Sequence, residues 1–124
     1  MIEIKNETEK VILVGVSLSD QDDTKESLEE LKDLVSTAGA ETVGMVIQNR
    51  EQQHPGTYVG KGKIEELKSM IWELRATGIV CDDELSPAQM KNLQDELDVK
   101  VMDRTLIILD IFAARASTSE GKIQ

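Results

Sequence analysis

Thr57-Tyr-Val-Gly-Lys-Gly-Lys-Ile-Glu-Glu-Leu67 is the stretch around which the rest of this sequence is organised. It places Gly60, Lys61, Gly62 and Lys63 just before a segment with helical periodicity. Glycine tolerates positive φ and leaves its backbone N–H uncovered, and the N-terminus of a helix attracts anions through unpaired N–H groups and the helix dipole. The stretch therefore predicts a turn through positive φ followed by an anion-binding helix start.

Segments typical of strands and helices alternate on both sides of this stretch. Residues 11–16 form a continuous apolar run, which indicates a strand covered on both faces and hence a parallel sheet. The other expected strands cover residues 42–48, 79–81 and 99–102. Four strand–helix units predict an α/β fold, a three-layer sandwich whose four-stranded parallel sheet has the order 2-1-3-4 and is flanked by helices.

Helix boundaries follow from capping residues. Asp23 with Glu26 resembles a capping box, and the helix that follows is expected to end at Gly39. Ser86 before Pro87 is typical of an N-cap with proline at the first helical position. Asp103 is expected to cap the last helix.

The helix at residues 63–77 is expected to bury four aliphatic side chains and to end at Gly78. Trp72 lies off that apolar stripe, so we expect it to be partly exposed or to face another element. The buried stripe comprises Ile64, Leu67, Ile71 and Leu74.

The last helix, residues 104–116, is apolar around nearly its whole circumference. Such a helix needs apolar partners on two sides, and the sheet of a domain this small supplies one. We therefore expect the other side to meet a further segment of the protein or, in the isolated chain, a second copy. Residues 1–9 are expected to be a frayed leader.

Composition limits the classes of function. The net charge of −10 argues against a freestanding nucleic-acid binder, although residues 54–81 and 100–124 each carry +1. A single cysteine, Cys81, excludes an internal disulfide and fits a reducing cytosol. No apolar run reaches transmembrane length, so we expect a cytoplasmic location and no membrane partner.

No catalytic constellation can be drawn from the sequence. The glycine–lysine stretch fits neither a Walker A loop nor the dinucleotide fingerprint, which has a glycine where Glu65 stands. Acids at residues 82–84 can hold Mg²⁺ together with Asp20, Asp22, Asp23 and Asp103. Acids near helix starts are more often solvated caps, and we favour that interpretation. Cys81 and His54 have no partners at metal-ligand spacing, so no metal is expected. Arg104 can contact an anion at its helix start or pair with a neighbouring acid.

Three stretches together resemble the N-terminal domain of HflX, a family of ribosome-associated GTPases. They are the opening stretch, Asp82-Asp-Glu-Leu-Ser-Pro-Ala-Gln89, and Asp103-Arg-Thr-Leu-Ile-Ile-Leu-Asp-Ile-Phe-Ala113. Gly121-Lys-Ile-Gln124 resembles the start of the segment that follows in the family. Residues 1–50 match only in pattern.

The resemblance implies an N-terminal domain at residues 1–116 and, at 117–124, the start of a linker to a helical hairpin and a G domain. It implies a whole protein that binds the large ribosomal subunit and its rRNA, hydrolyses GTP with Mg²⁺ and separates stalled or stressed ribosomes. The nucleotide machinery is expected beyond Gln124, so these residues alone should bind no cofactor of the GTPase reaction and should not be an enzyme. The implied rRNA or anion contact comprises Gly60, Lys61, Gly62 and Lys63 with Arg104.

Two other functions remain open from the residues. One is a receiver-like regulatory domain that binds Mg²⁺ and accepts a phosphoryl group on Asp82 or Asp83, although no lysine after a fifth strand is present. The other is a small ATP-binding domain that uses the glycine loop at residues 56–63.

Overall fold

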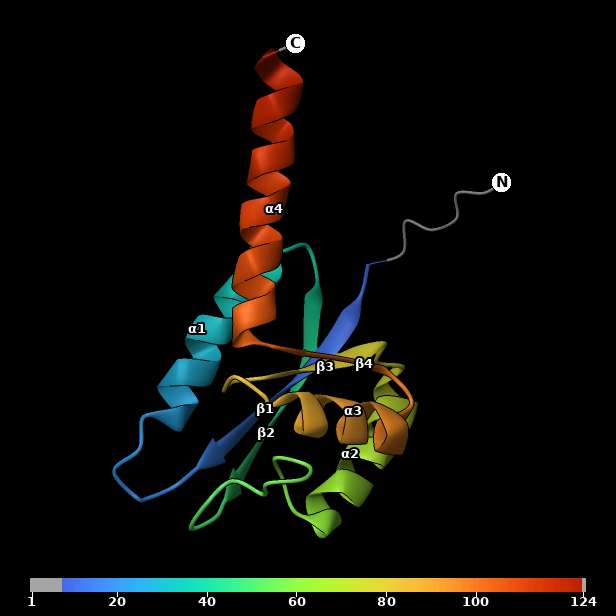
Figure 1. The fold of residues 1–124 in the computed structure, drawn as a ribbon. Helices are drawn as coiled ribbons and strands as arrows, with labels where there is room; N and C mark the ends of the chain where they lie inside the picture. The colour runs from blue at the N-terminus through green and yellow to red at the C-terminus, as the bar shows by residue number, and fades with distance from the viewer. Residues whose placement is uncertain (1–7, 124) are drawn as a thin grey trace.

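A parallel sheet of four strands forms the centre of the molecule, as the computed structural model shows for residues 8–123 (Figure 1). The strand order β2-β1-β3-β4 and the parallel pairing confirm the predicted topology. The residues after β1 and β3 thus leave the same edge of the sheet. The strands are β1 (Lys10–Ser17), β2 (Glu41–Asn49), β3 (Gly78–Cys81) and β4 (Lys100–Asp103).

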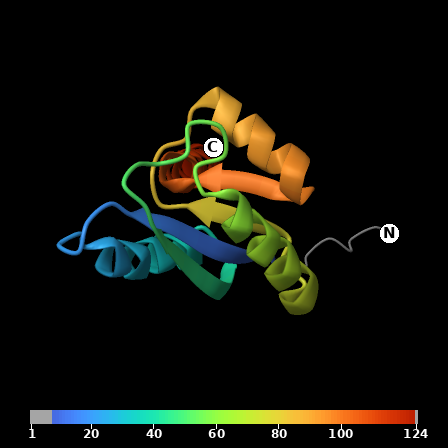
Figure 2. The ribbon, with the colours of Figure 1, turned by 90° about the horizontal axis from the view of Figure 1, so that it is seen from below.

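Helices cover both faces of the sheet, which confirms the three-layer arrangement (Figure 2). On one face α1 and α4 pack on side chains such as Leu13, and on the other α2 and α3 pack on side chains such as Ile12. Neighbouring residues of a strand point to opposite faces, so the apolar run in β1 supplies both layers of the core. The helices are α1 (Thr24–Thr37), α2 (Lys61–Leu74), α3 (Pro87–Leu97) and α4 (Arg104–Ile123).

The N-terminal cap of α3 has the predicted geometry, whereas that of α1 does not. Ser86 Oγ accepts a hydrogen bond from Gln89 N at 3.1 Å, and Gln89 Oε1 accepts one from Ser86 N at 2.9 Å, which completes a capping box. Asp23 makes no side-chain cap hydrogen bond to α1. The expected box with Glu26 is therefore wrong.

The bounds of α2 differ from the prediction at both ends. The helix begins at Lys61, and it ends at Leu74 because Arg75 adopts the left-handed conformation with φ of 57°. Gly78 is not a helix cap but the first residue of β3, where an added Cβ would lie 2.7 Å from the backbone oxygen of Lys100. Leu74, expected to be buried, is 38% exposed because it is the last helical residue.

The helix α4 continues to Ile123, so the predicted end at residue 116 is wrong (Figure 1). No proline interrupts it, and each added residue of a formed helix gains a backbone hydrogen bond. Ile107 is buried against α1, while Leu106, Leu109 and Phe112 are 40%, 57% and 61% exposed. The expected apolar side without a partner is thus present on α4.

No helix within residues 8–123 is both long and apolar enough to span a bilayer. Residues 1–7 of the expected leader lie outside the described part of the chain.

Candidate functional site

The loop between β2 and α2 is held by a compact set of hydrogen bonds around His54. The imidazole Nδ1 accepts from the backbone N–H of Gly56 at 3.0 Å and of Thr57 at 3.1 Å. His54 and Tyr58 also form an antiparallel bridge, with N to O distances of 3.1 and 2.8 Å. Nδ1 is therefore unprotonated in this arrangement, because it serves as the acceptor for two donors.

Side chains from two secondary-structure elements, α3 and β2, hold this loop in place. Gln89 Nε2 donates to the carbonyl of His54 at 2.8 Å, and Asn92 Nδ2 donates to the carbonyl of Gly56 at 2.9 Å, both from α3. Gln48, in β2, accepts a hydrogen bond from Gly60 N at 2.8 Å. The loop is thus positioned on the sheet edge before α2 begins.

Tyr58 connects the loop to the acidic segment after β3. Its side chain is fully buried, and its hydroxyl donates to Asp83 Oδ2 at 2.6 Å. Burial, then the hydrogen bond to Asp83, and then the nearby charges raise the pKa of Tyr58 well above its usual range. A neutral, buried phenol is therefore the stable form in the fold.

The positive-φ turn lies at Tyr58 and not at the glycines. Tyr58 has φ of 69°, whereas Gly60 has φ of −76° and Gly62 lies in the first turn of α2. The prediction of a turn through positive φ at these two glycines is wrong. Gly60 is instead a site of close approach, because an added Cβ would lie 2.6 Å from Arg50 Nη1.

The N-terminus of α2 carries no side-chain cap. Lys61 is exposed and has no ion-pair partner among the described residues, and an added Cβ at Gly62 would meet nothing within 4 Å. Lys63 pairs with Glu66 at 2.9 Å, an exposed pair that contributes at most about 1 kcal/mol. The backbone N–H groups at this helix start are therefore left to solvent or to an anion.

Arg104 does not join the glycine–lysine loop. It begins α4, on the opposite face of the sheet from α2, and its guanidinium lies 2.9 Å from Asp82 Oδ1 and 3.0 Å from Glu30 Oε1. It also donates to the carbonyl of Ser27 at 2.9 Å. Burial lowers the pKa of Arg104, but the two carboxylates outweigh burial and leave the pKa raised.

The acids after β3 are already engaged with other side chains. Asp82 is 9% exposed and pairs with Arg104, and Asp83 accepts the hydroxyl of Tyr58. Within residues 8–123 no group of three or more His, Cys, Asp or Glu side chains is arranged to hold a metal ion. The geometry gives the receiver-like alternative no support.

Asp103 and Cys81 are both buried, and their surroundings indicate structural roles. Asp103 is 3% exposed, and its two oxygens accept from Leu85 N at 2.8 Å and Leu106 N at 2.9 Å, so it caps α4 as predicted. Burial, and then the charge of Asp103 and nearby acids, raise the pKa of Cys81 well above its usual range. A thiol held in the protonated form is a poor nucleophile, which fits the buried position of Cys81 at the end of β3.

A cavity of about 350 Å³ adjoins the loop. Its charged side chains are one cation, Lys61, and two carboxylates, Glu65 and Glu96. The excess of negative charge does not favour a polyphosphate there. His54, Thr57 and Ile64 complete its lining.

Sequence reasoning missed the residues that fasten the loop. Gln48, Tyr58, Gln89 and Asn92 show no periodicity or spacing that indicates this role, since their partners lie 12 to 36 residues away. The one available signal was His54 followed by Pro55 and Gly56, a composition typical of a tight turn.

Comparison with known proteins gives consistent matches. The family model for GTP-binding GTPase N-terminal domains matches residues 25–113. Over 124 residues the chain is 68% identical to the GTPase HflX of Lacrimispora saccharolytica, covering 100% of this chain and 29% of that protein. It is 41% identical over 116 residues to the GTPase HflX of Escherichia coli, covering 94% of this chain and 27% of that protein.

A solved structure shares the fold. It is a GTP-binding protein from Sulfolobus solfataricus in complex with GDP, with a TM-score of 0.62 and 24% identity over 84% of this chain and 30% of that one. The chain thus spans less than a third of each of these proteins.

Proposed function

Because the chain belongs to the GTP-binding GTPase N-terminal family of HflX proteins, we propose that it is the ribosome-contact and regulatory domain of a longer GTPase. In this proposal the whole protein binds the large ribosomal subunit in the cytoplasm, hydrolyses GTP and helps to separate stalled or stressed ribosomes. The domain itself positions the G domain through contact with rRNA and carries out no chemistry. GTP and Mg²⁺ would be bound outside these 124 residues, which contain no Walker A sequence.

The observation that carries the rRNA contact is the exposed start of α2. Lys61 has no ion-pair partner among the described residues, Gly62 leaves the backbone open, and no side chain caps the helix. Phosphate groups bind at such helix starts, where N–H groups and the dipole act together. Gly60 to Lys63 form the proposed contact, and Lys63 can exchange its exposed partner Glu66 for a phosphate.

Arg104 has a different part in this proposal. Its guanidinium is 2.9 Å from Asp82 and also joins α1, so binding a phosphate would require it to leave these partners. We therefore assign Arg104 to the scaffold that holds α4 against α1.

Binding of the chain to purified large subunits tests the contact. Lys61→Glu with Lys63→Glu should weaken binding, and the wild-type affinity should fall steeply with salt because phosphate contacts release counterions. Lys25→Glu with Lys32→Glu makes the same charge change on α1, on the opposite face of the sheet, and should bind as the wild type does. Equal binding by the two double variants would show that the loop at residues 60–63 does not contact rRNA.

The apolar side of α4 is the proposed docking surface for the protein's own helical segment. Leu106, Leu109 and Phe112 lie along one side of the helix and remain exposed in this chain. In isolation this side should pair with a second copy. Sedimentation of the wild type should show dimers that Leu109→Glu with Phe112→Glu converts to monomers; a wild type that stays monomeric at high concentration would contradict this.

The ATP-binding alternative rests on the glycine loop and can be tested separately. A ligand present at about 100 times its dissociation constant stabilises the folded state by about 2.7 kcal/mol. Thermal unfolding with ATP, ADP and GTP would therefore show a clear shift if the cavity beside Lys61 binds a nucleotide. The two carboxylates in that cavity lead us to expect no shift.

A further inference from the structure

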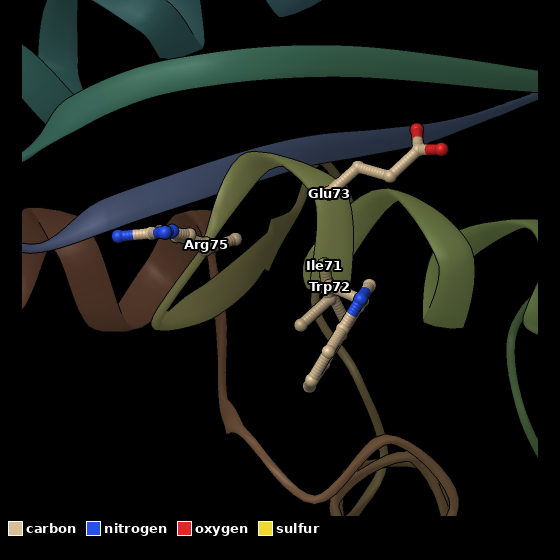
Figure 3. Close-up of a pocket in the computed structure, with 5 residues that line it drawn as sticks. Ile71, Trp72, Glu73 and Arg75 are labelled. Carbon is tan, nitrogen blue, oxygen red and sulfur yellow. The ribbon is translucent and has the colours of Figure 1, made fainter.

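Trp72 is the most exposed of the large apolar side chains that the structure describes, at 84%. It is the only tryptophan in the sequence. The indole projects away from the strands of the sheet, beside an open cavity of about 730 Å³ (Figure 3). Ile71, Glu73, Arg75 and Ala76 complete the lining of that cavity. Leaving an indole in water forgoes much of the free energy that burial of so large an apolar side chain provides.

No second exposed large apolar side chain adjoins Trp72 among the described residues. The other exposed apolar residue of α2, Leu74, is two positions further on, and so points about 200° away around the helix. The exposed apolar side chains of α4 lie beyond the opposite face of the sheet. A protein partner is normally anchored by a contiguous cluster of apolar and aromatic side chains. A single exposed ring is instead sufficient to stack one nucleic-acid base.

Cationic side chains share this side of α2. Positions 61, 68 and 72 fall within about 40° of one another around a helix, which places Lys61 and Lys68 in line with Trp72. Arg75 follows the last helical turn and has no ion-pair partner among the described residues.

Lys68 is neutralised by Glu65 at 3.1 Å and Glu96 at 3.7 Å, and the same two carboxylates line the cavity beside Lys61. A strand bound along this side of α2 would therefore contact Lys61 outside that cavity. From Lys61 to Arg75 the helix rises by roughly 21 Å, a length comparable to a few nucleotides of an extended strand.

We propose that this side of α2 binds single-stranded RNA, with one base stacked on Trp72 and phosphates contacted by Arg75 and Lys61. The inference rests on the proposed function and extends the contact at the helix start along the helix. Stacking on an aromatic ring is tolerant of sequence, because every base presents a flat π surface. The site would therefore prefer unpaired RNA over a duplex, whose bases are already stacked.

The sole tryptophan makes the proposal directly measurable in the 124-residue chain. Titration with an adenosine or uridine octamer RNA should quench the indole fluorescence saturably, and the same sequence as a duplex should quench little. Trp72→Ala should weaken binding of a labelled octamer at least fivefold by anisotropy, and Trp72→Phe should restore part of the affinity. Arg75→Gln should flatten the dependence of log affinity on log salt by about 0.7.

Phe112→Ala is the matched control, an exposed aromatic on α4 that should leave RNA binding unchanged. Equal affinities of the wild type and Trp72→Ala, or an indole that stays unquenched at saturation, would overturn the proposal. If a Trp72→Ala chain loses large-subunit binding but not octamer binding, the partner of this side is a protein, which also overturns it. Loss of subunit binding on changing Lys61 and Lys63, with no effect at Trp72, would leave the proposed function standing and remove only this inference.

Discussion

The hydrogen bond between Tyr58 and Asp83 should stabilise the fold, so removing the Tyr58 hydroxyl should lower the free energy of unfolding. Tyr58→Phe removes only the hydroxyl, which lies 2.6 Å from Asp83 Oδ2 in a side chain that is fully buried. A hydrogen bond to a charged group contributes about 1.5–3 kcal/mol. Asp83 is half-buried, so water can replace the lost donor in part, and we expect a loss near the lower limit of about 1.5 kcal/mol.

The same variant should change how stability depends on pH. Burial first, and then the hydrogen bond to Asp83, raise the pKa of Tyr58 in the folded chain, whereas in the unfolded chain a tyrosine has a pKa of about 10. Below about pH 10 both the folded and the unfolded state keep the phenol proton, so the stability that the neutral Tyr58 contributes is fully present. Above it the unfolded state alone loses the proton, so the free energy of unfolding falls by up to about 1.4 kcal/mol per pH unit until the pH passes the folded pKa.

Urea unfolding followed by circular dichroism, at about pH 7 and about pH 10.5, measures both effects. Tyr58→Phe should unfold at lower urea at neutral pH and lose less stability than the wild type on the way to alkaline pH. Cys81 also has a raised pKa, but it is present in both proteins and its contribution cancels in the comparison. Asp83→Asn, which keeps an acceptor oxygen, serves as the milder control.

Tyr58 is the sole tyrosine, so its ionisation can be followed by tyrosinate absorbance without interference. The reasoning is refuted if native protein shows ordinary phenol ionisation near pH 10 while the dichroism stays unchanged. Equal urea midpoints of the wild type and Tyr58→Phe at neutral pH would refute it as well.

Three further substitutions test the local geometry by urea unfolding. Gly62→Ala should stabilise the fold by about 0.5–1 kcal/mol, because the site is helical and open; a loss would show that the helix start is not as described. Gly78→Ala should cost about 1–3 kcal/mol, since its Cβ would lie 2.7 Å from the backbone oxygen of Lys100; a neutral outcome would contradict the close strand approach. Asp103→Asn should cost about 1–3 kcal/mol, because an amide can accept from only one of two backbone donors, one of them Leu106 N; an unchanged midpoint would contradict the double contact.

The architecture could be predicted because it follows from features that are local in the sequence. The apolar run in β1 indicated a strand covered on both faces, and Ser86 with Pro87 marked the start of α3. Strand–helix alternation together with right-handed crossovers then left few strand orders, among them the observed one. Trp72 was expected to lie off the buried stripe of α2, and its exposure confirms this.

The site could be predicted only in part. The sequence placed Lys61 just before a helix expected at residues 63–77, whereas in the structure the helix begins at Lys61 itself and has no side-chain cap. The glycine pattern was misleading, because Gly60 and Gly62 are equally suited to positive φ, to a close approach or to an open helical turn. Which of these applies depended on Gln48 and Arg50, residues of a distant strand end that no local pattern connects to the loop.

The sequence by itself determined the elements, their order in the sheet and the faces they bury, since apolar periodicity, capping and chain connectivity are short-range properties. The tertiary structure alone decided the strained φ at Tyr58, its bond to Asp83 25 residues away and the capture of Arg104 by α1, 77 residues from its partner Ser27. The physical reason is that a hydrogen bond or an ion pair forms only when the whole fold brings donor and acceptor within about 3 Å. Partners that are far apart in the sequence leave no periodic pattern in the chain.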